Sequence, residues 1–396
     1  MTRHALLLAI LMVVSAAPVA AQSLLGTRGL GVPVAPVDAR GRALGGIGVG
    51  LLGTSASFLN PADAAGAPRK GVLAAVQPIT GTVAVNGASD AFGGARFPVM
   101  NVLYPIGTRL VATAGYGGFL DQSWAISTEG RIVVGADTLT TSDVLDSRGG
   151  IARLQLGLAY TLTPALAVGL GGGVYTGGLE RRVARGFPGA EPPLQGYDER
   201  FRWDYLAPHA TLGVRWDPDP ALRVSAAVTL SGELSADSAG GPARSATFDL
   251  PHRAVVGASA MLGPDLMAAL GAERTFGVAA TRTDPSQETA TVTERETWRL
   301  GGGLEYTGVR RGARTYPLRL GGSWLQLPFH RVDEGPATEW AFGGGGGFRF
   351  GEASAPLALA DLTVERGRRS GLATANASGL SESFWRFTFA VAVFGQ

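Results

Sequence analysis

The sequence predicts a closed antiparallel β-barrel that spans a membrane, and three observations lead to this fold class. Large apolar residues recur at every second position, as at Leu154, Leu156, Leu158 and Tyr160, with small or polar residues between them. Successive strand side chains point to opposite faces, so such a segment has one apolar face. No stretch after Ala21 reaches the roughly 18 apolar residues of a spanning helix. Finally, short and long breaks alternate along the chain, as expected for the two ends of an outer-membrane barrel.

The N-terminus has the pattern of an export signal. Arg3 and His4 are followed by an apolar run at residues 5–14 and by small residues up to Ala21. The apolar run is too short to span a membrane, so we predict a cleaved signal peptide at residues 1–21. The alternative is a buried N-terminal helix.

The composition fits a sheet that faces lipid. Gly accounts for 59 of 396 residues, and charged residues for 17%, against a usual share of about 25%. In lipid, only helices and closed barrels satisfy the backbone hydrogen bonds. The chain has no Cys, which excludes disulfides and thiolate metal sites. A net charge of +2 gives no reason to expect nucleic acid as a partner.

The breaks define about fourteen strands, an even number, with both barrel ends on the periplasmic side. The predicted strands are residues 72–85, 92–103, 109–126, 149–161, 165–177, 199–216, 221–233, 247–261, 265–276, 291–308, 314–327, 337–350, 357–367 and 382–394. Residues 124–134 look like a further strand, but counting them would reverse the order of short and long turns. We therefore interpret them as half of an extended hairpin that rises from a long outer loop.

The alternation also assigns the two faces of the wall. Leu156, Leu300 and Phe389 are expected to face lipid, whereas Gln155, Gly157 and Thr229 are expected to face the interior. Most of the inward positions, which also include Arg299 and Glu305, are small and weakly polar. A general diffusion porin has a wet channel lined by charge. A lumen with few charges instead favours a solid or apolar filling.

A motif between the signal and the first strand carries a family resemblance. Residues 38–50 are rich in Gly and contain Arg40 and Arg42, and Asn60-Pro61-Ala62 follows. This arrangement resembles the start of the FadL-type outer-membrane proteins, the transporters of long-chain fatty acids and aromatic hydrocarbons. That family usually has Gly after the motif, where this chain has Asp63. The last strand is similar to the same family and to the related PorV-like group. The resemblance implies a fourteen-stranded barrel plugged by an N-terminal hatch.

The segment between signal and barrel has a physical interpretation of its own. Residues 22–70 are rich in Gly and small residues, which pack closely in a narrow lumen, and they lack the charge of a disordered tail. We predict a hatch at residues 22–70 and a barrel at 71–396; a floppy periplasmic tail is the alternative. Asn60 is expected to cap a turn, with Pro61 at its first position. Phe58 and Leu59 are the apolar residues expected on a ligand path.

The expected function is uptake of hydrophobic small molecules through the outer membrane of a Gram-negative-type bacterium. Expected partners are outer-membrane lipid, the ligand and the barrel-assembly machinery, which would recognise the strand ending at Phe394. No cofactor, metal or catalytic residue is expected. Two alternatives remain: a PorV-like barrel that docks or shuttles secreted proteins, and a barrel enzyme that uses His209, His252 or His330.

Overall fold

The computed structural model describes residues 23–27, 30–53, 57–85, 87–134, 137–190, 193–239, 245–276, 279–282, 290–293, 296–328, 337–351, 356–374 and 377–395. The predicted signal peptide, residues 1–21, and the third candidate catalytic residue, His330, lie outside these ranges. No helix within them is long and apolar enough to cross a membrane.

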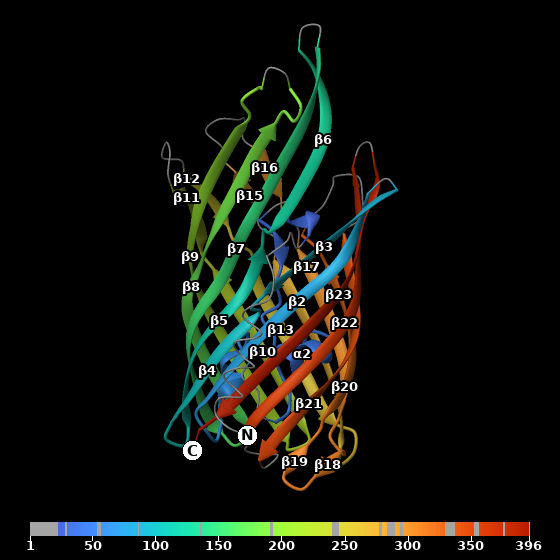
Figure 1. Ribbon diagram of the computed structural model, residues 1–396. Coiled ribbons are helices and arrows are strands. Elements are labelled where there is room, and N and C mark those ends of the chain that lie inside the picture. Colours follow the sequence, from blue (N-terminus) through green and yellow to red (C-terminus); the bar gives the residue numbers. More distant parts are fainter. Residues whose placement is uncertain are drawn as a thin grey trace.

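The described strands form a closed antiparallel barrel of 14 strand positions, which confirms the predicted fold class (Figure 1). The strands at the positions, in order, are β2 (Gly71–Val85), β3 (Ala88–Arg96) continued by β4 (Val99–Ile106), β5 (Leu110–Asp121), β7 (Asp137–Thr163), β8 (Leu166–Gly186), β9 (Tyr197–Asp219), β10 (Leu222–Ser231) continued by β11 (Glu233–Ser238), β12 (Ser245–Asp249) continued by β13 (His252–Met261), β14 (Leu266–Phe276), β17 (Thr297–Tyr306), β20 (Leu318–Gln326), β21 (Thr338–Gly351), β22 (Pro356–Thr374) and β23 (Ala377–Phe394). The barrel closes where β2 pairs with β23, in a register that joins Gly71 to Phe394.

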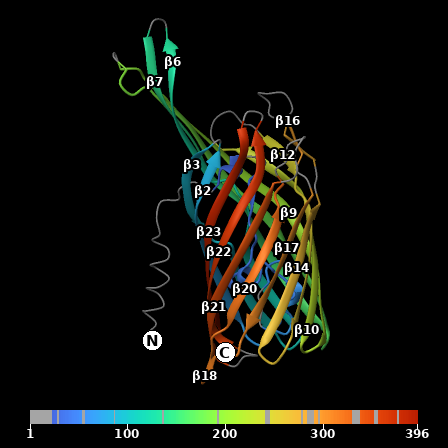
Figure 2. The same cartoon turned by 90° about the vertical axis from the view of Figure 1, so that its right-hand side faces the viewer.

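Most long breaks turn out to be strands that continue beyond the barrel. β7, β8 and β9 contain 27, 21 and 23 residues, so the segments predicted as long loops are largely hairpin arms. β6 (Trp124–Val134) pairs with the first part of β7, which confirms the predicted extended hairpin. Together, β6 and the outer parts of β7, β8 and β9 form a sheet, here called the tower, that rises above the barrel rim (Figure 2).

The remaining short strands lie in connections between barrel strands. They are β15 (Ala279–Arg282), β16 (Ala290–Thr293), β18 (Arg310–Arg311) and β19 (Arg314–Thr315). β15 and β16 form a separate two-stranded sheet, whereas β18 and β19 form a small hairpin that joins the barrel through β21.

The outward face follows the predicted alternation. Leu156, Leu300 and Phe389 are 70%, 45% and 39% exposed, and their neighbours Gln155 and Arg299 are buried. The expectation of an inner face with few charges is wrong. Inward positions on β17 and β20–β23 carry Glu305, Arg319 and many other ionised side chains. The prediction counted Arg299 and Glu305 of β17 as exceptions among small inward residues. It missed the inward Arg153 of β7 and the charged inward residues of β20–β23.

The N-terminal segment lies inside the barrel (Figure 1). It contains η1 (Leu24–Thr27), β1 (Val32–Pro33), α2 (Ala39–Ala43) and η2 (Pro61–Ala64), and most of its described residues are buried. The short helix α2 begins at Asp38, whose carboxylate accepts a hydrogen bond from the Gly41 amide at 2.7 Å. Such a cap satisfies an amide that has no partner within the helix. β1 adds to the barrel wall by pairing with the end of β5.

Candidate functional site

Asn60 joins the N-terminal segment to the barrel wall. Its Oδ1 accepts a hydrogen bond from the Ala62 amide at 3.0 Å, and it caps η2 with Pro61 in the first turn. Its Nδ2 donates to the Val214 carbonyl of β9 at 3.1 Å. The predicted cap is therefore present in the structure, and the same amide also ties the turn to the wall.

Glycines on the wall make room for this turn. A Cβ at Gly213 would lie 1.9 Å from Asn60 Oδ1, and a Cβ at Gly169 would lie 2.3 Å from the Ala62 amide nitrogen. Neither distance is compatible with a side chain. The Asn60-Pro61-Ala62 turn therefore sits directly on the backbone of β8 and β9.

Asp63, the residue after the Asn60-Pro61-Ala62 motif, has a structural role in the same turn. Its Oδ1 accepts a hydrogen bond from Ser225 Oγ at 2.6 Å, and its Oδ2 accepts one from the Gly50 amide at 3.1 Å. Arg215 of β9 donates to the carbonyls of Asp63 and Ala65. The turn is thus held to β9 and β10 by backbone and side-chain contacts together.

Phe58 and Leu59 are both buried, at 3% exposure each. The Arg153 guanidinium of β7 lies 4.4 Å from the centroid of the Phe58 ring, and its Nη2 donates to the Phe58 carbonyl at 3.1 Å. Leu59 packs with Val37, Val49 and barrel residues Ala227 and Val255. The structure therefore places both at the interface of segment and wall; their role on a ligand path stays a prediction.

An apolar cluster, here called the outer cluster, fills the interior toward the end with the long connections. Its members are Leu30, Phe119, Leu120, Ile151, Tyr175, Leu179, Tyr205, Ala207, Leu234, Ala236, Phe248 and Leu250. The rings of Phe119 and Tyr175 are 4.5 Å apart, and Tyr175 is 5.0 Å from His209. Sequence reasoning missed this cluster because its members come from six strands, a residue between β12 and β13, and the N-terminal segment. The available signal was the recurrence of inward aromatic residues in the outer parts of consecutive strands.

The wall is interrupted beside this cluster, between β3 and β5. Among the described residues, β3 pairs with β2 alone, and the end of β5 pairs instead with β1 of the N-terminal segment. We call this interruption the β3–β5 seam. A salt bridge of 3.7 Å between Arg96 and Asp121 crosses it. The seam is the one place along the described wall positions where the N-terminal segment supplies the pairing strand.

On the opposite wall, the N-terminal segment follows a track of inward glycines. A Cβ at Gly301 would lie 1.9 Å from the Gly45 carbonyl oxygen, and one at Gly257 would lie 2.4 Å from that of Val49. Between them, Gly271 faces Ile47. Residues 45–49 therefore cross β17, β14 and β13 at close range, because the wall carries no side chains there. The contacts at Gly301 and Gly257 are with backbone, and the contact at Gly271 is with the Ile47 side chain.

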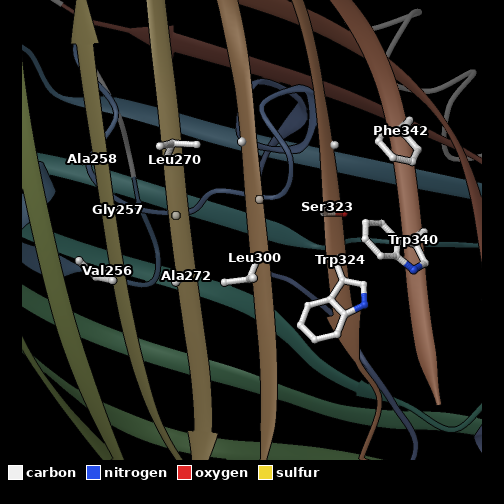
Figure 3. Close-up of a pocket in the computed structure, with 14 residues that line it drawn as sticks. Val256, Gly257, Ala258, Leu270, Ala272, Leu300, Ser323, Trp324, Trp340 and Phe342 are labelled. Carbon is white, nitrogen blue, oxygen red and sulfur yellow. The ribbon is translucent and has the colours of Figure 1, made fainter. Parts of the chain in front are cut away.

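The outer side of the same strands is hollowed into an apolar groove with a volume of about 660 Å³ (Figure 3). Figure 3 shows the side chains of Leu270, Leu300, Trp324, Trp340 and Phe342 around it. These side chains belong to the outward face, where Leu270 is 69% exposed and Phe342 is 64% exposed. The groove therefore opens toward the surroundings of the barrel and not toward its lumen.

Buried ion pairs hold α2 to the inner face of the wall at β17 and β22. Glu305 of β17 accepts hydrogen bonds from Arg40 at 2.8 Å, Arg319 at 2.5 Å and Arg349 at 3.0 Å. Arg42 lies 3.7 Å from Glu365. Because buried charges are costly unless they are paired, these contacts favour one seating of the segment over any displaced one.

The two described candidate catalytic histidines contact backbone atoms. His209 Nε2 lies 3.0 Å from the Leu154 carbonyl, and His252 Nδ1 accepts from the Ser231 amide at 3.2 Å. No hydrogen bond in the described part of the chain joins either ring to a serine hydroxyl or a carboxylate. This arrangement gives the enzyme alternative no support.

No protein-family model and no curated protein matches the sequence. Solved structures do match. The chain is similar to a FadL homologue of Pseudomonas aeruginosa, with a TM-score of 0.62, 15% identity, and coverage of 92% of this chain and 99% of that one. It is also similar to the toluene transporter TbuX of Ralstonia pickettii, with a TM-score of 0.59, 16% identity, and coverage of 92% and 99%.

A third similar structure is the toluene transporter TodX of Pseudomonas putida, with a TM-score of 0.55, 14% identity, and coverage of 92% and 99%. At such low identity the likeness concerns the fold, and it extends over nearly the whole of each chain. The protein therefore has the fold of the FadL-type barrels.

Proposed function

We propose that this protein resides in the outer membrane and carries hydrophobic small molecules, such as fatty acids or aromatic hydrocarbons, across it. The observation that carries the proposal is the outer cluster, an aromatic and aliphatic surface inside a barrel whose centre is filled. Burial of apolar surface contributes about 25 cal/mol per Å², so such a surface binds a hydrophobic solute without charged contacts. The printed names of the similar structures, a FadL homologue and two toluene transporters, support the same substrate class.

The geometry supports a path with two steps. A solute first replaces side-chain contacts among Phe119, Tyr175 and Tyr205 in the outer cluster. It then leaves either past a displaced N-terminal segment, which acts as a hatch, or sideways through the β3–β5 seam. The seam lies next to the cluster because Phe119 and Leu120 belong to the end of β5.

The test is uptake by cells that lack their own carrier. The parent protein should accelerate entry of an alkylbenzene or a long-chain fatty acid, and Phe119→Ala should slow that entry several-fold because it removes part of the binding surface. The matched control is Leu156→Ala, which removes a similar apolar side chain from the lipid-facing wall. Equal uptake with and without the parent protein, for every apolar solute tested, would overturn the proposal.

A second candidate function, docking of secreted proteins, is favoured by the tower. Three consecutive barrel strands continue into it, and β6 has an edge without a partner strand among the described residues. Unpaired strand edges are templates for pairing with another chain. Removal of the tower tip, residues 128–143, separates the two functions. Loss of a bound secreted protein with normal solute uptake would support docking, whereas loss of neither property would exclude this role of the tower.

A further inference from the structure

The outer wall of β13–β21 has a recess where two outward side chains are missing. Gly302 pairs with Gly322 across β17 and β20, and both point away from the lumen because their strand neighbours Gly301 and Gly321 contact the N-terminal segment. In the same cross-strand row, Gly302 pairs with Leu270 on one side and Gly322 pairs with Phe342 on the other. The row therefore has a large side chain at each end, Leu270 and Phe342, and no side chain at the two glycines between them.

The neighbouring rows enclose this recess. On one side, Leu300 pairs with Trp324, and Trp324 pairs with Trp340. On the other side, Leu304 pairs with Leu320, and both are exposed apolar residues. Trp340 and Phe342 stack with an interplanar angle of 10°, which gives the recess a flat aromatic wall (Figure 3). The backbones of Gly302 and Gly322 thus form the floor of the apolar groove of about 660 Å³.

The lining of the groove determines the chemistry of its occupant. No charged side chain lines it. Its one side chain with a hydroxyl, Ser323, is 9% exposed and belongs to the inward-facing positions of β20. Apart from the indole N–H groups of Trp324 and Trp340, the outward-facing side chains of the lining are apolar, so a charged headgroup would find no opposite charge there. An unpaired charged group is costly to bury. The volume lies within the range of small-molecule sites, roughly 300 to 1,000 Å³. The groove therefore fits a hydrocarbon chain and not a headgroup.

Its position indicates where that chain comes from. The groove belongs to the outward apolar belt, which in this class of barrel faces the acyl region of the bilayer. Its floor is closed from inside, because the Gly45 carbonyl and Leu44 pack against Gly301 and Gly303 of the same strand. Access is thus from the membrane side. We propose that this groove is a specific binding site for one acyl chain of a membrane lipid.

The proposal is tested by filling the recess. A Cβ at Gly302 would meet the end of the Leu270 side chain at 2.7 Å, and one at Gly322 would meet the Phe342 ring at 2.7 Å. Both neighbours are exposed and free to turn away, so Gly302→Leu with Gly322→Leu should leave the barrel intact. The matched control is Gly346→Leu on the same outward face of β21, at a position that does not line the groove.

The measurement is native mass spectrometry of protein purified from vesicles of phosphatidylethanolamine and phosphatidylglycerol and then washed in mild detergent. We expect one retained lipid on the parent and on the Gly346→Leu control, and a lipid-bound fraction at least tenfold lower for the filled variant. An acyl chain brominated near its middle should also quench the fluorescence of the parent after the wash, and Trp324→Phe should remove much of that quenching. Heat-modifiable migration on a gel confirms that each variant is folded.

Two results would overturn the assignment. Equal lipid retention by parent and filled variant would show that the groove is not the site. Displacement of the retained lipid by decane or free palmitate, together with slower solute uptake by the filled variant, would instead assign the groove to the transported molecule. Uptake is measured separately from lipid retention, so failure of this inference leaves the proposed transport function open to its own test.

Discussion

At the scale of single residues, the seating of the N-terminal segment depends on a fit between one amide and one glycine. Asn60 is completely buried, caps η2 and donates to the Val214 carbonyl. The missing side chain at Gly213 leaves the space that Asn60 Oδ1 occupies. A change at either Asn60 or Gly213 is therefore expected to weaken the contact between the N-terminal segment and the wall, and mutagenesis can measure this loss.

We expect Asn60→Ala and Gly213→Ala each to loosen the segment, the former by about 1 kcal/mol because a cap is lost. The readout is the rate of proteolysis of the N-terminal segment in the folded barrel. The double variant should be no looser than Gly213→Ala alone, since residues in contact do not act additively. Thr27→Ala, at an exposed hydroxyl of η1, is the control and should leave the rate unchanged. Additive effects would show that the two sites act independently.

Glu305 supports a second prediction at this scale. It accepts hydrogen bonds from Arg40, Arg319 and Arg349, and its side chain is 3% exposed. Glu305→Gln removes the carboxylate that these three arginines share, although Arg319 keeps a second partner in Asp361 at 2.7 Å. Breaking a buried pair typically costs about 3 to 5 kcal/mol. Glu296→Gln, at a half-exposed carboxylate paired with Arg274, should cost under about 1 kcal/mol. Denaturant unfolding in detergent compares the two variants, and equal losses would contradict this account.

At the scale of elements, two adjacent glycines of β17 have different functions because successive residues of a strand face opposite sides. Gly301 contacts the N-terminal segment and Gly302 faces outward. A side chain at the first position would collide with the Gly45 carbonyl, a backbone atom, at 1.9 Å. One at the second would meet the movable end of Leu270 at 2.7 Å and the Ala269 carbonyl at 3.3 Å. One strand can therefore hold the segment on one face and a groove on the other.

We predict that Gly301→Ala displaces the N-terminal segment and that Gly302→Ala does not. In a planar bilayer, the first variant should show more frequent or larger ion conductance than the parent, because part of the lumen filling is pushed from the wall. The second variant, one residue away, should match the parent. The prediction is wrong if Gly301→Ala and Gly302→Ala show the same low ion conductance while both remain folded.

The tower is the element for which a pH dependence is expected. Arg185 donates two hydrogen bonds to Asp143, at 2.5 and 2.7 Å, and thereby holds the pKa of that carboxyl below its ordinary value. Arg182 lowers the pKa of Asp198 in the same way. A lowered pKa contributes stability that is present above the ordinary value, about 3.9, and is lost as the pH falls through the lowered one.

We therefore expect the amides of β6 and β7 in the tower to lose protection below about pH 4, while those of the barrel strands keep it. Hydrogen exchange, corrected for the intrinsic rate at each pH, measures this difference. Asp143→Asn with Asp198→Asn should weaken the tower at neutral pH and flatten its pH dependence. Protection of the parent tower that does not change with pH would contradict the role of these pairs.

At the scale of the whole molecule, the barrel is wide but filled. The N-terminal segment, the outer cluster and the buried ion pairs occupy the lumen from different strands. A porin conducts ions through a wet lumen lined by charge. Here the charges on β17 and β20–β23 are buried and largely paired.

We predict that the intact protein migrates differently on a gel before and after boiling, with a mainly β-type circular dichroism spectrum. We also predict poor ion conductance in a planar bilayer, despite acceleration of hydrophobic solute entry into cells. Both follow from a closed sheet around a packed interior. Large and steady porin-type conductance of the parent would contradict the filled lumen.

The sequence by itself determined the features that depend on short-range periodicity. Alternation of apolar residues predicted the barrel part of each strand, as for 265–276 against Leu266–Phe276, and it assigned the outward face. It did not predict the outer ends of β7, β8 and β22, which begin or end 12, 9 and 7 residues beyond the predicted bounds. The order of short and long breaks predicted the strand count and the hairpin of residues 124–134. Asn60 and Pro61 predicted the capped turn, because a cap is a local interaction between neighbours in the chain.

Only the tertiary structure decided which distant residues meet. Two examples are the contacts of Arg40 with Glu305 and of Asn60 with Gly213. Both depend on the register of the strands and on the closure of the barrel, and no local sequence pattern determines either. The same holds for the outer cluster, the β3–β5 seam and the recess at Gly302 and Gly322. Each arises from side chains, or missing side chains, that come together across several strands. Periodicity therefore sets the face of a residue, and register sets its neighbours.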